Sequence, residues 1–346
     1  MTSVFVYEYI SGGGTLSEAS LPAESLRREG GAMLRAAASD FQALPDVCVT
    51  VLHDARWAGL ELPPCEIVTV AEASAEQAAF QQLARRADWT LVIAPEFRGI
   101  LRDRCRTVAA AGGKLLSPGE EFVAVAADKP QTVQRLAAAG IPVPQGVRWD
   151  PASPLPRDFP YPAVLKPADG AGSLGVQWID GVGRAVGRAG LGDAAWLERY
   201  CPGLPASVAV LCGPAGLAPL PACRQRLSDD GRFRYLGGEA PLDEPLTRRA
   251  QRLAVAAVAA LAPTVGYVGV DLVLGDADDG REDVVIEVNP RLTTSYVGLR
   301  RLVRGNLAAA MLAAACGLPV ALSFAAGRVV FDADGTCRWV RASDAS

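Results

Sequence analysis

Two neighbouring strand-like segments in the C-terminal third place the strongest constraint on how this chain can fold. Residues 268–291 read VGVDLVLGDADDGREDVVIEVNPR and predict a hairpin whose acidic turn is centred on Asp279. Alternation along the second strand puts Glu287 and Asn289 on one face, roughly 6.5 to 7 Å apart. Antiparallel pairing about that centre sets Asp271 opposite Glu287, with Cβ atoms about 5 Å apart. The segment therefore predicts two carboxylates and an amide oxygen on one patch.

This set of oxygen atoms suits a divalent cation. Mg²⁺ is usually held by one or two carboxylates together with the phosphates of a substrate. Two carboxylates this close repel each other unless a cation lies between them. Asp271 and Glu287 each interrupt an otherwise apolar strand, where charge is costly, so we interpret them as metal ligands. The acids of the turn itself fit a solvated hairpin tip: Asp276, Asp278, Asp279 and Glu282.

Length, charge and cysteine usage exclude several classes of protein. A chain of 346 residues predicts two or three domains, and a net charge of −4 argues against binding to duplex nucleic acid. The apolar tracts are too short to span a bilayer, and no basic region precedes the first one. Eight scattered cysteines without a CxxC pair predict a cytoplasmic protein with reduced thiols. The single histidine, His53, rules out a His-rich zinc site, and we predict a structural role for it.

Strands and helices alternate over residues 1–120, which predicts an α/β domain with a parallel sheet. The predicted strands are 3–10, 47–52, 89–94 and 114–117, and the predicted helices are 21–38, 73–87 and 102–111. Ligands bind such sheets at the carboxyl ends of the strands. That rule makes Gly12, Gly13, Gly14 and Glu96 candidates for substrate binding. Plain turn roles for the glycines, and pairing with an amine or capping of a helix for Glu96, are the alternatives.

The next part of the chain carries two lysines and a glycine-rich loop. Lys129 precedes a predicted helix at 131–139, and Lys166 ends a predicted strand at 161–166. The loop 170–175 that follows can close over phosphates with its backbone N–H groups, and an ordinary hairpin is the alternative. The remaining predicted elements are strands 176–179, 195–200 and 206–212, helices 246–262 and 306–316, and a hairpin over 327–340. Arg248, Arg249 and Arg252 are predicted on the solvent side of helix 246–262.

In this order the motifs resemble the ATP-grasp superfamily, from Asp128 to about Leu312. The resemblance implies an α/β and α+β fold in which two sheets grip ATP, preceded by a parallel α/β pre-ATP-grasp domain. It predicts an N-terminal substrate domain (1–120), a lid subdomain (121–197), a C-terminal subdomain with the metal site (198–325) and a terminal hairpin (326–346). The implied reaction joins a carboxylate to an amine through an acyl phosphate.

The resemblance also implies roles for individual residues. Two lysines would hold the ATP phosphates: Lys129 and Lys166. The lid over the phosphates corresponds to Gly170, Gly172, Ser173 and Gly175. The hinge that reads the adenine edge corresponds to Glu198, Arg199, Tyr200 and Cys201. Two Mg²⁺ or Mn²⁺ ions would be held by Asp271, Glu287 and Asn289, and the catalytic side chains would be Arg291 and Lys166.

One position departs from the family pattern. The family often places a glutamate shortly after the hinge glycine to hold the ribose hydroxyls. Here Gly203 is followed by Leu204, Pro205, Ala206 and Ser207, with no acid. The ribose must therefore be held more loosely or by residues elsewhere.

Three short motifs resemble one subgroup, that of the tyramine–L-glutamate ligases of methanofuran-type cofactor synthesis in one-carbon metabolism. They are VYEYISGGG at 6–14, APE at 94–96 and NPRLTTSY at 289–296. The subgroup implies L-glutamate as acyl donor and a phenethylamine as acceptor, with small molecules as the partners. A homodimer is compatible with this assignment. The open alternatives are a ligase adding an amino acid to a pterin-like or peptide acceptor, a kinase, and an ATP-binding regulatory protein without chemistry.

Overall fold

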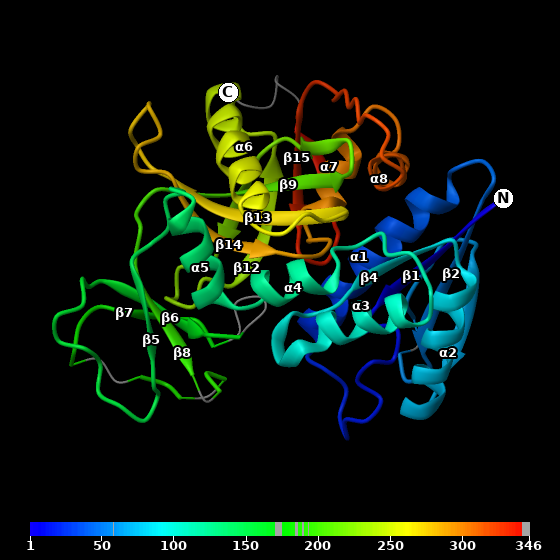
Figure 1. Ribbon diagram of the computed structural model, residues 1–346, viewed down its shortest axis with the longest axis horizontal. Coiled ribbons are helices and arrows are strands. Elements are labelled where there is room, and N and C mark those ends of the chain that lie inside the picture. Colours follow the sequence, from blue (N-terminus) through cyan, green and yellow to red (C-terminus); the bar gives the residue numbers. More distant parts are fainter. Residues whose placement is uncertain (58, 170–174, 184–185, 189, 193, 341–346) are drawn as a thin grey trace.

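Three β-sheets organise the computed structural model, which describes residues 1–57, 59–169, 175–183, 186–188, 190–192 and 194–340. A parallel sheet forms the N-terminal third, a small antiparallel sheet lies at the opposite end, and a large sheet lies between them (Figure 1). Within these residues, no helix has the length and apolar character needed to span a membrane.

The N-terminal sheet is parallel throughout, with strand order β3-β2-β1-β4, which confirms the predicted α/β domain. Its elements are β1 (Thr2–Glu8), α1 (Glu24–Gln42), β2 (Val47–Asp54), β3 (Glu66–Val70), α2 (Ala73–Arg86), β4 (Trp89–Ile93), η1 (Phe97–Gly99) and α3 (Ile100–Ala110). The strand predicted at 114–117 is wrong in extent, because only Leu115 pairs, in a single bridge to Thr90. Pro118, which lacks an N–H, ends the extended segment just before the next helix.

The small sheet has the order β5-β8-β6-β7 and is antiparallel. It consists of β5 (Gly146–Trp149), β6 (Ala163–Pro167), β7 (Gln177–Ile179) and β8 (Ala195–Arg199). Two helices connect it to the N-terminal sheet: α4 (Glu120–Ala126) and α5 (Lys129–Ala138). A separate apolar core, which includes Trp149, Leu165 and Leu197, packs inside this part of the chain.

The large sheet has eight strands in the order β14-β13-β9-β11-β12-β15-β16, with β10 paired to β9. Its strands are β9 (Leu204–Gly213), β10 (Gly216–Pro219), β11 (Cys223–Leu227), β12 (Tyr235–Ala240), β13 (Gly266–Leu274), β14 (Val284–Asn289), β15 (Arg328–Asp332) and β16 (Cys337–Val340). Its helices are α6 (Glu244–Ala259), α7 (Tyr296–Leu302) and α8 (Leu307–Ala315). The C-terminal hairpin therefore extends this sheet, since β15 pairs with β12.

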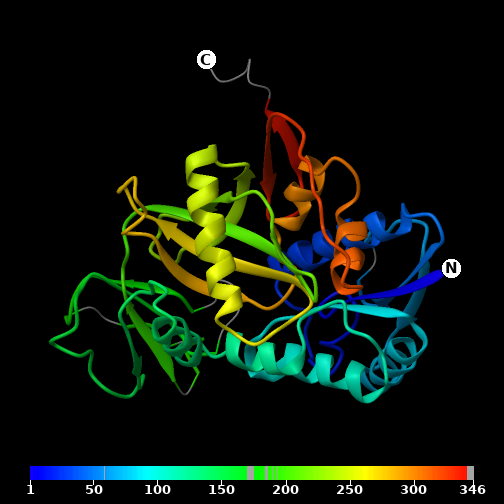
Figure 2. The same ribbon diagram turned by 45° about the horizontal axis from the view of Figure 1, so that its top comes forward.

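Both faces of the large sheet are buried, and its central strands distribute their side chains accordingly. Val208 and Val270 pack in the core beneath α6, which lies across the sheet (Figure 2). Leu211 and Tyr267, on the opposite face, pack in a core shared with α1, α7 and α8. The second face is apolar only along part of each strand, because towards residues 205–207 and 271–273 it borders a cavity.

Candidate active site

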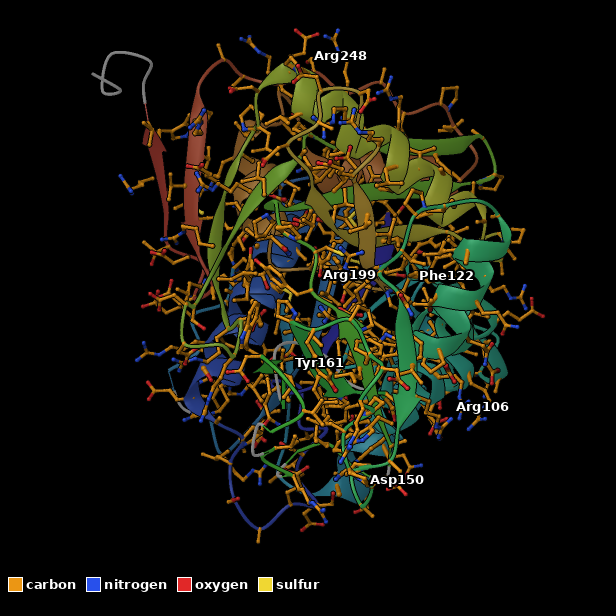
Figure 3. All side chains as sticks on the ribbon, turned by 90° about the vertical axis from the view of Figure 1, so that its left-hand side faces the viewer. Arg106, Phe122, Asp150, Tyr161, Arg199 and Arg248 are labelled. Carbon is orange, nitrogen blue, oxygen red and sulfur yellow. The ribbon has the colours of Figure 1, made fainter. Side chains whose placement is uncertain are left out.

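A cavity of about 250 Å³ lies between the small and large sheets and is lined mainly by residues of β6, β8, β9, β13 and β14. In Figure 3 Arg199, one of its lining residues, lies between the green strands of the small sheet and the yellow strands of the large one. Predicted site residues that line the cavity are Lys129, Lys166, Glu198, Arg199, Tyr200, Cys201, Asp271, Glu287, Asn289 and Arg291.

The two predicted acids of the hairpin meet in the cavity wall. Asp271 pairs directly with Glu287 across β13 and β14, which confirms the predicted register, and a bulge follows between Asp271 and Leu272. Asn289 donates its Nδ2 to Asp271 Oδ2 at 3.1 Å, and Gln225 donates its Nε2 to Asp271 Oδ1 at 2.9 Å. Asp271 is thus held by two neutral amides and no cation among the described residues.

The electrostatics of these two carboxylates differ sharply. Burial raises the pKa of Asp271 from 3.8 to about 7, the charge of Glu287 adds to the increase, and the hydrogen bond from Asn289 opposes it. Burial would also raise the pKa of Glu287, but Lys129 and Lys166 outweigh it and hold that pKa below its usual value. Glu287 is therefore stabilised as an anion, whereas Asp271 forms no ion pair with any described residue.

Two lysines make buried ion pairs at the edge of the cavity. Lys129 Nζ lies 2.8 Å from Glu287 Oε1, and Lys166 Nζ lies 2.6 Å from Glu198 Oε1. Lys129 occupies the first turn of α5, where the side chain of Asp128 caps the helix by accepting from the N–H of Gln131. Because both lysines are almost fully enclosed, they are positioned before any ligand arrives.

The N-terminal domain contributes one carboxylate to this region. Glu96, just past the carboxyl end of β4, lies 2.7 Å from Arg291, measured from Oε1 to Nε. The pair is close but poorly aligned for hydrogen bonding, and neither Glu96 oxygen nor Arg291 Nε has another hydrogen-bond partner among the described residues. Burial raises the pKa of Glu96, while the charge of Arg291 lowers it. Glu96 does not cap η1 with its side chain, so the capping alternative is wrong.

The residues around Asp271 fit a divalent cation only in part. Within the described ranges, no group of three or more His, Cys, Asp or Glu residues could enclose a metal ion. Asp271, Glu287 and the amide oxygen of Asn289 would supply an incomplete set of hard ligands. Mg²⁺ typically completes such a set with waters and substrate phosphates, and it would relieve the repulsion that raises the pKa of Asp271.

Comparison with known protein families assigns each of the two parts of the chain that contribute these residues to a family. Residues 47–123 match the family described as pre ATP-grasp 3 domain, and residues 126–295 match the family described as ATP-grasp domain. The chain contains an ATP-grasp domain. All the cationic and metal-ligating candidates named above fall inside this domain, whereas Glu96 falls inside the pre-ATP-grasp domain.

Individual relatives support the fold. The tyramine–L-glutamate ligase of Methanocaldococcus fervens is 28% identical over 217 residues, and the match covers 62% of each chain, less than two thirds of the relative. An ATP-grasp superfamily protein from Archaeoglobus fulgidus superposes with a TM-score of 0.71 at 22% identity, covering 96% of this chain and 92% of the other. A biotin carboxylase complex from Campylobacter jejuni superposes with a TM-score of 0.72 at 18% identity, covering 95% of this chain and 74% of the other.

The segment predicted to be the adenine hinge, residues 198–201, is built from backbone contacts and aromatic rings. The N–H of Arg199 donates to Gln145 O at 2.8 Å, and that of Tyr200 donates to Pro162 O at 3.0 Å. The Tyr200 ring packs edge-on against Trp178, with centroids 4.7 Å apart, and near-parallel to Phe233 at 6.3 Å. These N–H groups are committed within the protein, so the hinge has a fixed shape beside the cavity.

The segment after the predicted hinge carries no acid at the position where the family often has a glutamate, and its backbone is closely packed. Gly203 has φ +144, and a Cβ there would lie 2.4 Å from Leu274 O, so β9 begins in close contact with the end of β13. Pro205 lines the cavity near the position where the family often has its glutamate. Gln225 and Ser207 also line it; sequence reasoning did not name Gln225 and gave Ser207 no role.

Some predicted residues lie elsewhere. Gly12, Gly13 and Gly14 are absent from the cavity lining, and the N–H groups of Gly12 and Gly14 donate to Glu8 O and Tyr9 O in tight turns. Their substrate role remains a prediction. Gly170, Gly172 and Ser173 fall outside the described residues. Gly175 is described, with φ +75, and a Cβ there would lie 2.9 Å from Gly190 O.

Sequence reasoning also missed two residues that meet at the cavity from distant segments. Glu29 lies on α1 of the pre-ATP-grasp domain, and Thr294 follows β14 in the ATP-grasp domain. Thr294 Oγ1 donates to Glu29 Oε1, and both residues line the cavity. The NPRLTTSY motif marks the second partner, but nothing in the helical pattern of α1 singles out Glu29.

Proposed function

We propose that this protein is an ATP-dependent ligase that joins a carboxylate to an amine and releases ADP and phosphate. The observation that carries the proposal is the convergence of charge on one cavity between two sheets of an ATP-grasp fold. Two lysines, an arginine and a cluster of oxygen ligands line that cavity. This set can neutralise a triphosphate and a reacting carboxylate without a protein nucleophile.

In the first step, an oxygen of the substrate carboxylate attacks the γ-phosphorus of ATP, and the bond from that phosphorus to the bridging oxygen of ADP breaks. Negative charge spreads over the transferred phosphoryl group in the transition state. Lys129 and Lys166 would hold the phosphates, and the support is that each ammonium lies at the cavity edge in a buried ion pair. Arg291 would orient the carboxylate, and the support is that its guanidinium borders the cavity and lies beside Glu96.

In the second step, the amine nitrogen attacks the acyl carbon. An amine that binds as its ammonium first gives up one proton, which frees the lone pair for this attack. The C–N bond then forms, phosphate leaves with the electrons of the C–O bond, and the nitrogen loses its second proton. Arg291 can stabilise the oxyanion of the tetrahedral intermediate, since its guanidinium borders the same cavity. Exclusion of water is required throughout, because the acyl phosphate would otherwise hydrolyse.

Asp271, Glu287 and Asn289 would hold Mg²⁺ or Mn²⁺, in a site for two ions, against the phosphates. Bound there, the metal would neutralise phosphate charge and align the phosphoryl group for transfer. The protein's own part is to present the three oxygen ligands from adjacent strands, with Asp271 oriented by Gln225 and Asn289.

For the substrates we propose L-glutamate as donor and tyramine or a similar phenethylamine as acceptor. The support is the relative from Methanocaldococcus fervens, whose name states those two substrates, together with the APE and NPRLTTSY motifs of this chain. Such a product would belong to the synthesis of a methanofuran-type cofactor.

The test is an ADP-release screen of amino acid and amine pairs in the presence of Mg²⁺ or Mn²⁺, with mass spectrometry of the products. Amide formation that depends on both substrates is the expected result. A phosphorylated acid without amide would identify a kinase, and ATP binding without ADP formation across the screen would identify a regulatory protein. Lys166→Ala should reduce turnover by orders of magnitude, whereas Lys114→Ala, remote from the cavity lining, should not.

A further inference from the structure

The charged residues of the cavity wall form a pattern of ion pairs. Lys129 pairs with Glu287, Lys166 pairs with Glu198, and Arg291 pairs with Glu96. A fourth cation that lines the cavity, Arg199, is exposed at the hinge. Each enclosed cation among the described lining residues thus lies beside a carboxylate of the protein.

Two lining carboxylates remain without a cation among the described residues. Asp271 is the one that a metal ion would neutralise. The other is Glu29, which accepts a hydrogen bond from Thr294 Oγ1. An anionic side chain at the wall of a semi-enclosed cavity is unfavourable unless a cation or strong donors compensate it. The wall near Glu29 is therefore complementary to a positively charged group that the described part of the chain does not supply.

Glu29 lies close enough to the reacting centre to serve a substrate. Glu29 and Arg291 line the same cavity, and Thr294, which contacts Glu29, lies three residues after Arg291 in the chain. The charge of Glu29 raises the pKa of Tyr235, which lines the same cavity, although burial is the main cause there. Glu29 thus borders the same cavity as the guanidinium proposed to hold the carboxylate.

The surroundings of Glu29 add to its negative potential. The carboxyl of Glu8 lies against the next residue of α1, since a Cβ on Gly30 would fall 2.6 Å from the Glu8 Cδ atom. Glu8 accepts from the N–H and Oγ of Ser11 and from the N–H of Ile10, so its contacts are internal. Glu29 borders the cavity, whereas Glu8 is buried and does not line it.

We propose that Glu29 binds the ammonium group of the acceptor amine and selects for it. The ammonium then gives one proton to the Glu29 carboxylate, which frees the nitrogen lone pair for attack on the acyl carbon. This inference rests on the proposed ligase function and names the residue that recognises one of its substrates. One hydroxyl contacts the carboxylate, that of Thr294, and the adjacent Thr293 and Ser295, which contact each other at 2.9 Å, line the same cavity. A primary ammonium has three donors, which a carboxylate and neighbouring hydroxyl oxygens can accept.

Neither a second metal site at Glu29 nor amine binding by Glu96 fits this region as well. A metal site would need several hard ligands, whereas the side chain of Glu29 contacts a neutral hydroxyl, that of Thr294, and no group of three acids, histidines or cysteines forms among the described residues. Glu96, which the sequence offered as a partner for an amine, is committed to Arg291. Tyr235 lines the same cavity as Glu29, and an aromatic ring in the wall favours a cation or an apolar body attached to one.

The test compares charged and uncharged forms of the same ligand. Tyramine, phenethylamine and n-butylamine are each paired with the alcohol that replaces the amino group by hydroxyl. Binding to the full-length protein, loaded with Mg²⁺ and a non-hydrolysable ATP analogue, is measured by calorimetry for wild type, Glu29→Gln and Glu24→Gln. Glu24 lies on the same helix but is exposed and pairs with Arg28, so it is the matched control.

The expected result is that at least one amine binds wild type roughly 10- to 100-fold more tightly than its alcohol, the effect of a charged hydrogen bond. Glu29→Gln should abolish that preference, and Glu24→Gln should keep it. Thr294→Val should weaken the preference less than Glu29→Gln does, because it removes a hydrogen bond that orients the carboxylate without removing its charge. In turnover assays Glu29→Gln should raise the KM for the amine while the KM for ATP changes by less than about 2-fold.

The inference and the proposed function fail in different ways. If Glu29→Gln, shown folded by circular dichroism, binds amines as wild type does, or if wild type prefers none of the amines to its alcohol, the assignment of Glu29 is overturned. If amines bind in a Glu29-dependent manner but no amide forms with any donor, the ligase function fails and the ammonium site stands. If amide forms at unchanged amine KM in Glu29→Gln, the function stands and the inference is overturned.

Discussion

Replacing Asp271 by Asn should stabilise the metal-free protein while it abolishes the metal-dependent reaction. The reason is that the folded protein holds this carboxylate beside Glu287 without a cation, in contact with the amides of Gln225 and Asn289. Asparagine has nearly the same shape and can still bond to both amides after they reorient, but it carries no charge.

The magnitude follows from the pKa of Asp271, which rises from 3.8 to about 7 on folding. One pKa unit corresponds to about 1.4 kcal/mol, so the ionised carboxylate costs the folded protein roughly 4 kcal/mol above pH 7. Asp271 borders the cavity, where water can solvate it, which makes this value an upper limit. Between pH 3.8 and 7 the folded state holds the proton and the unfolded state has lost it, so stability falls as pH rises through that window.

The assay is urea unfolding in EDTA at pH 8 and at pH 5, followed by circular dichroism. Asp271→Asn should exceed wild type in stability by a few kcal/mol at pH 8 and by less than half that amount at pH 5, where the carboxyl of the folded wild type still holds its proton. Asp276→Asn, in the exposed turn of the same hairpin, is the control and should change neither value. Mg²⁺ with ADP should stabilise wild type and leave Asp271→Asn unchanged.

A variant no more stable than wild type at pH 8 would refute the reasoning, because it would mean that Asp271 carries no electrostatic cost in the folded protein. An advantage that is equal at pH 5 and pH 8 would do the same, since it would then not arise from ionisation. Retention of metal-dependent ADP formation in Asp271→Asn would remove Asp271 from the proposed metal site.

Three further predictions separate chemistry from stability. Glu287→Gln should lower amide formation by roughly 100-fold or more while the protein stays folded, because it removes a metal ligand; ADP release at saturating ATP measures this, and near-normal turnover would contradict it. Gly203→Ala should cost roughly 2 kcal/mol or more in urea unfolding, because its φ of +144 and the carbonyl of Leu274 leave no room for a Cβ; an unchanged midpoint would argue against the close approach. Arg249→Met should lower stability by roughly 3 to 5 kcal/mol, because it leaves Asp283 buried without its partner. Turnover per folded molecule should persist, and a selective loss of turnover would link this pair to the site.

The parts of the site that the sequence revealed are those set by local geometry. Alternation and hairpin symmetry were sufficient to place Asp271 opposite Glu287, and the pairing is observed. The bulge after Asp271 was not predicted, because the extra residue is Ile286 on β14, and that strand contains no glycine to mark it. The pairing held because the bulge lies on the turn side of Asp271, where it shifts only the later pairs.

Contacts between distant segments were beyond such reasoning. Arg249 was predicted on the solvent side of its helix, and this is wrong: it is buried and donates from Nε to Asp283 at 3.0 Å. Its neighbour Arg248 is exposed, as Figure 3 shows. A helical period identifies one wet face, but it cannot tell which arginine at the edge of that face will meet an acid from a hairpin. The sequence did not identify Glu29 for the same reason, since its partner Thr294 lies 265 residues away.

The large sheet shows why stability and function compete at Asp271 in particular. Along β13, Tyr267 packs in the core and Asp271 borders the cavity on the same face, and β9 repeats the pattern with Leu211 and Ser207. One strand therefore both holds the core and presents the ligand. Because the apolar part of each strand fixes its position, the polar part cannot move away from its neighbour to reduce repulsion. The cost of holding Asp271 beside Glu287 is thus built into the register of β13 and β14, and a divalent cation is the group best suited to offset it.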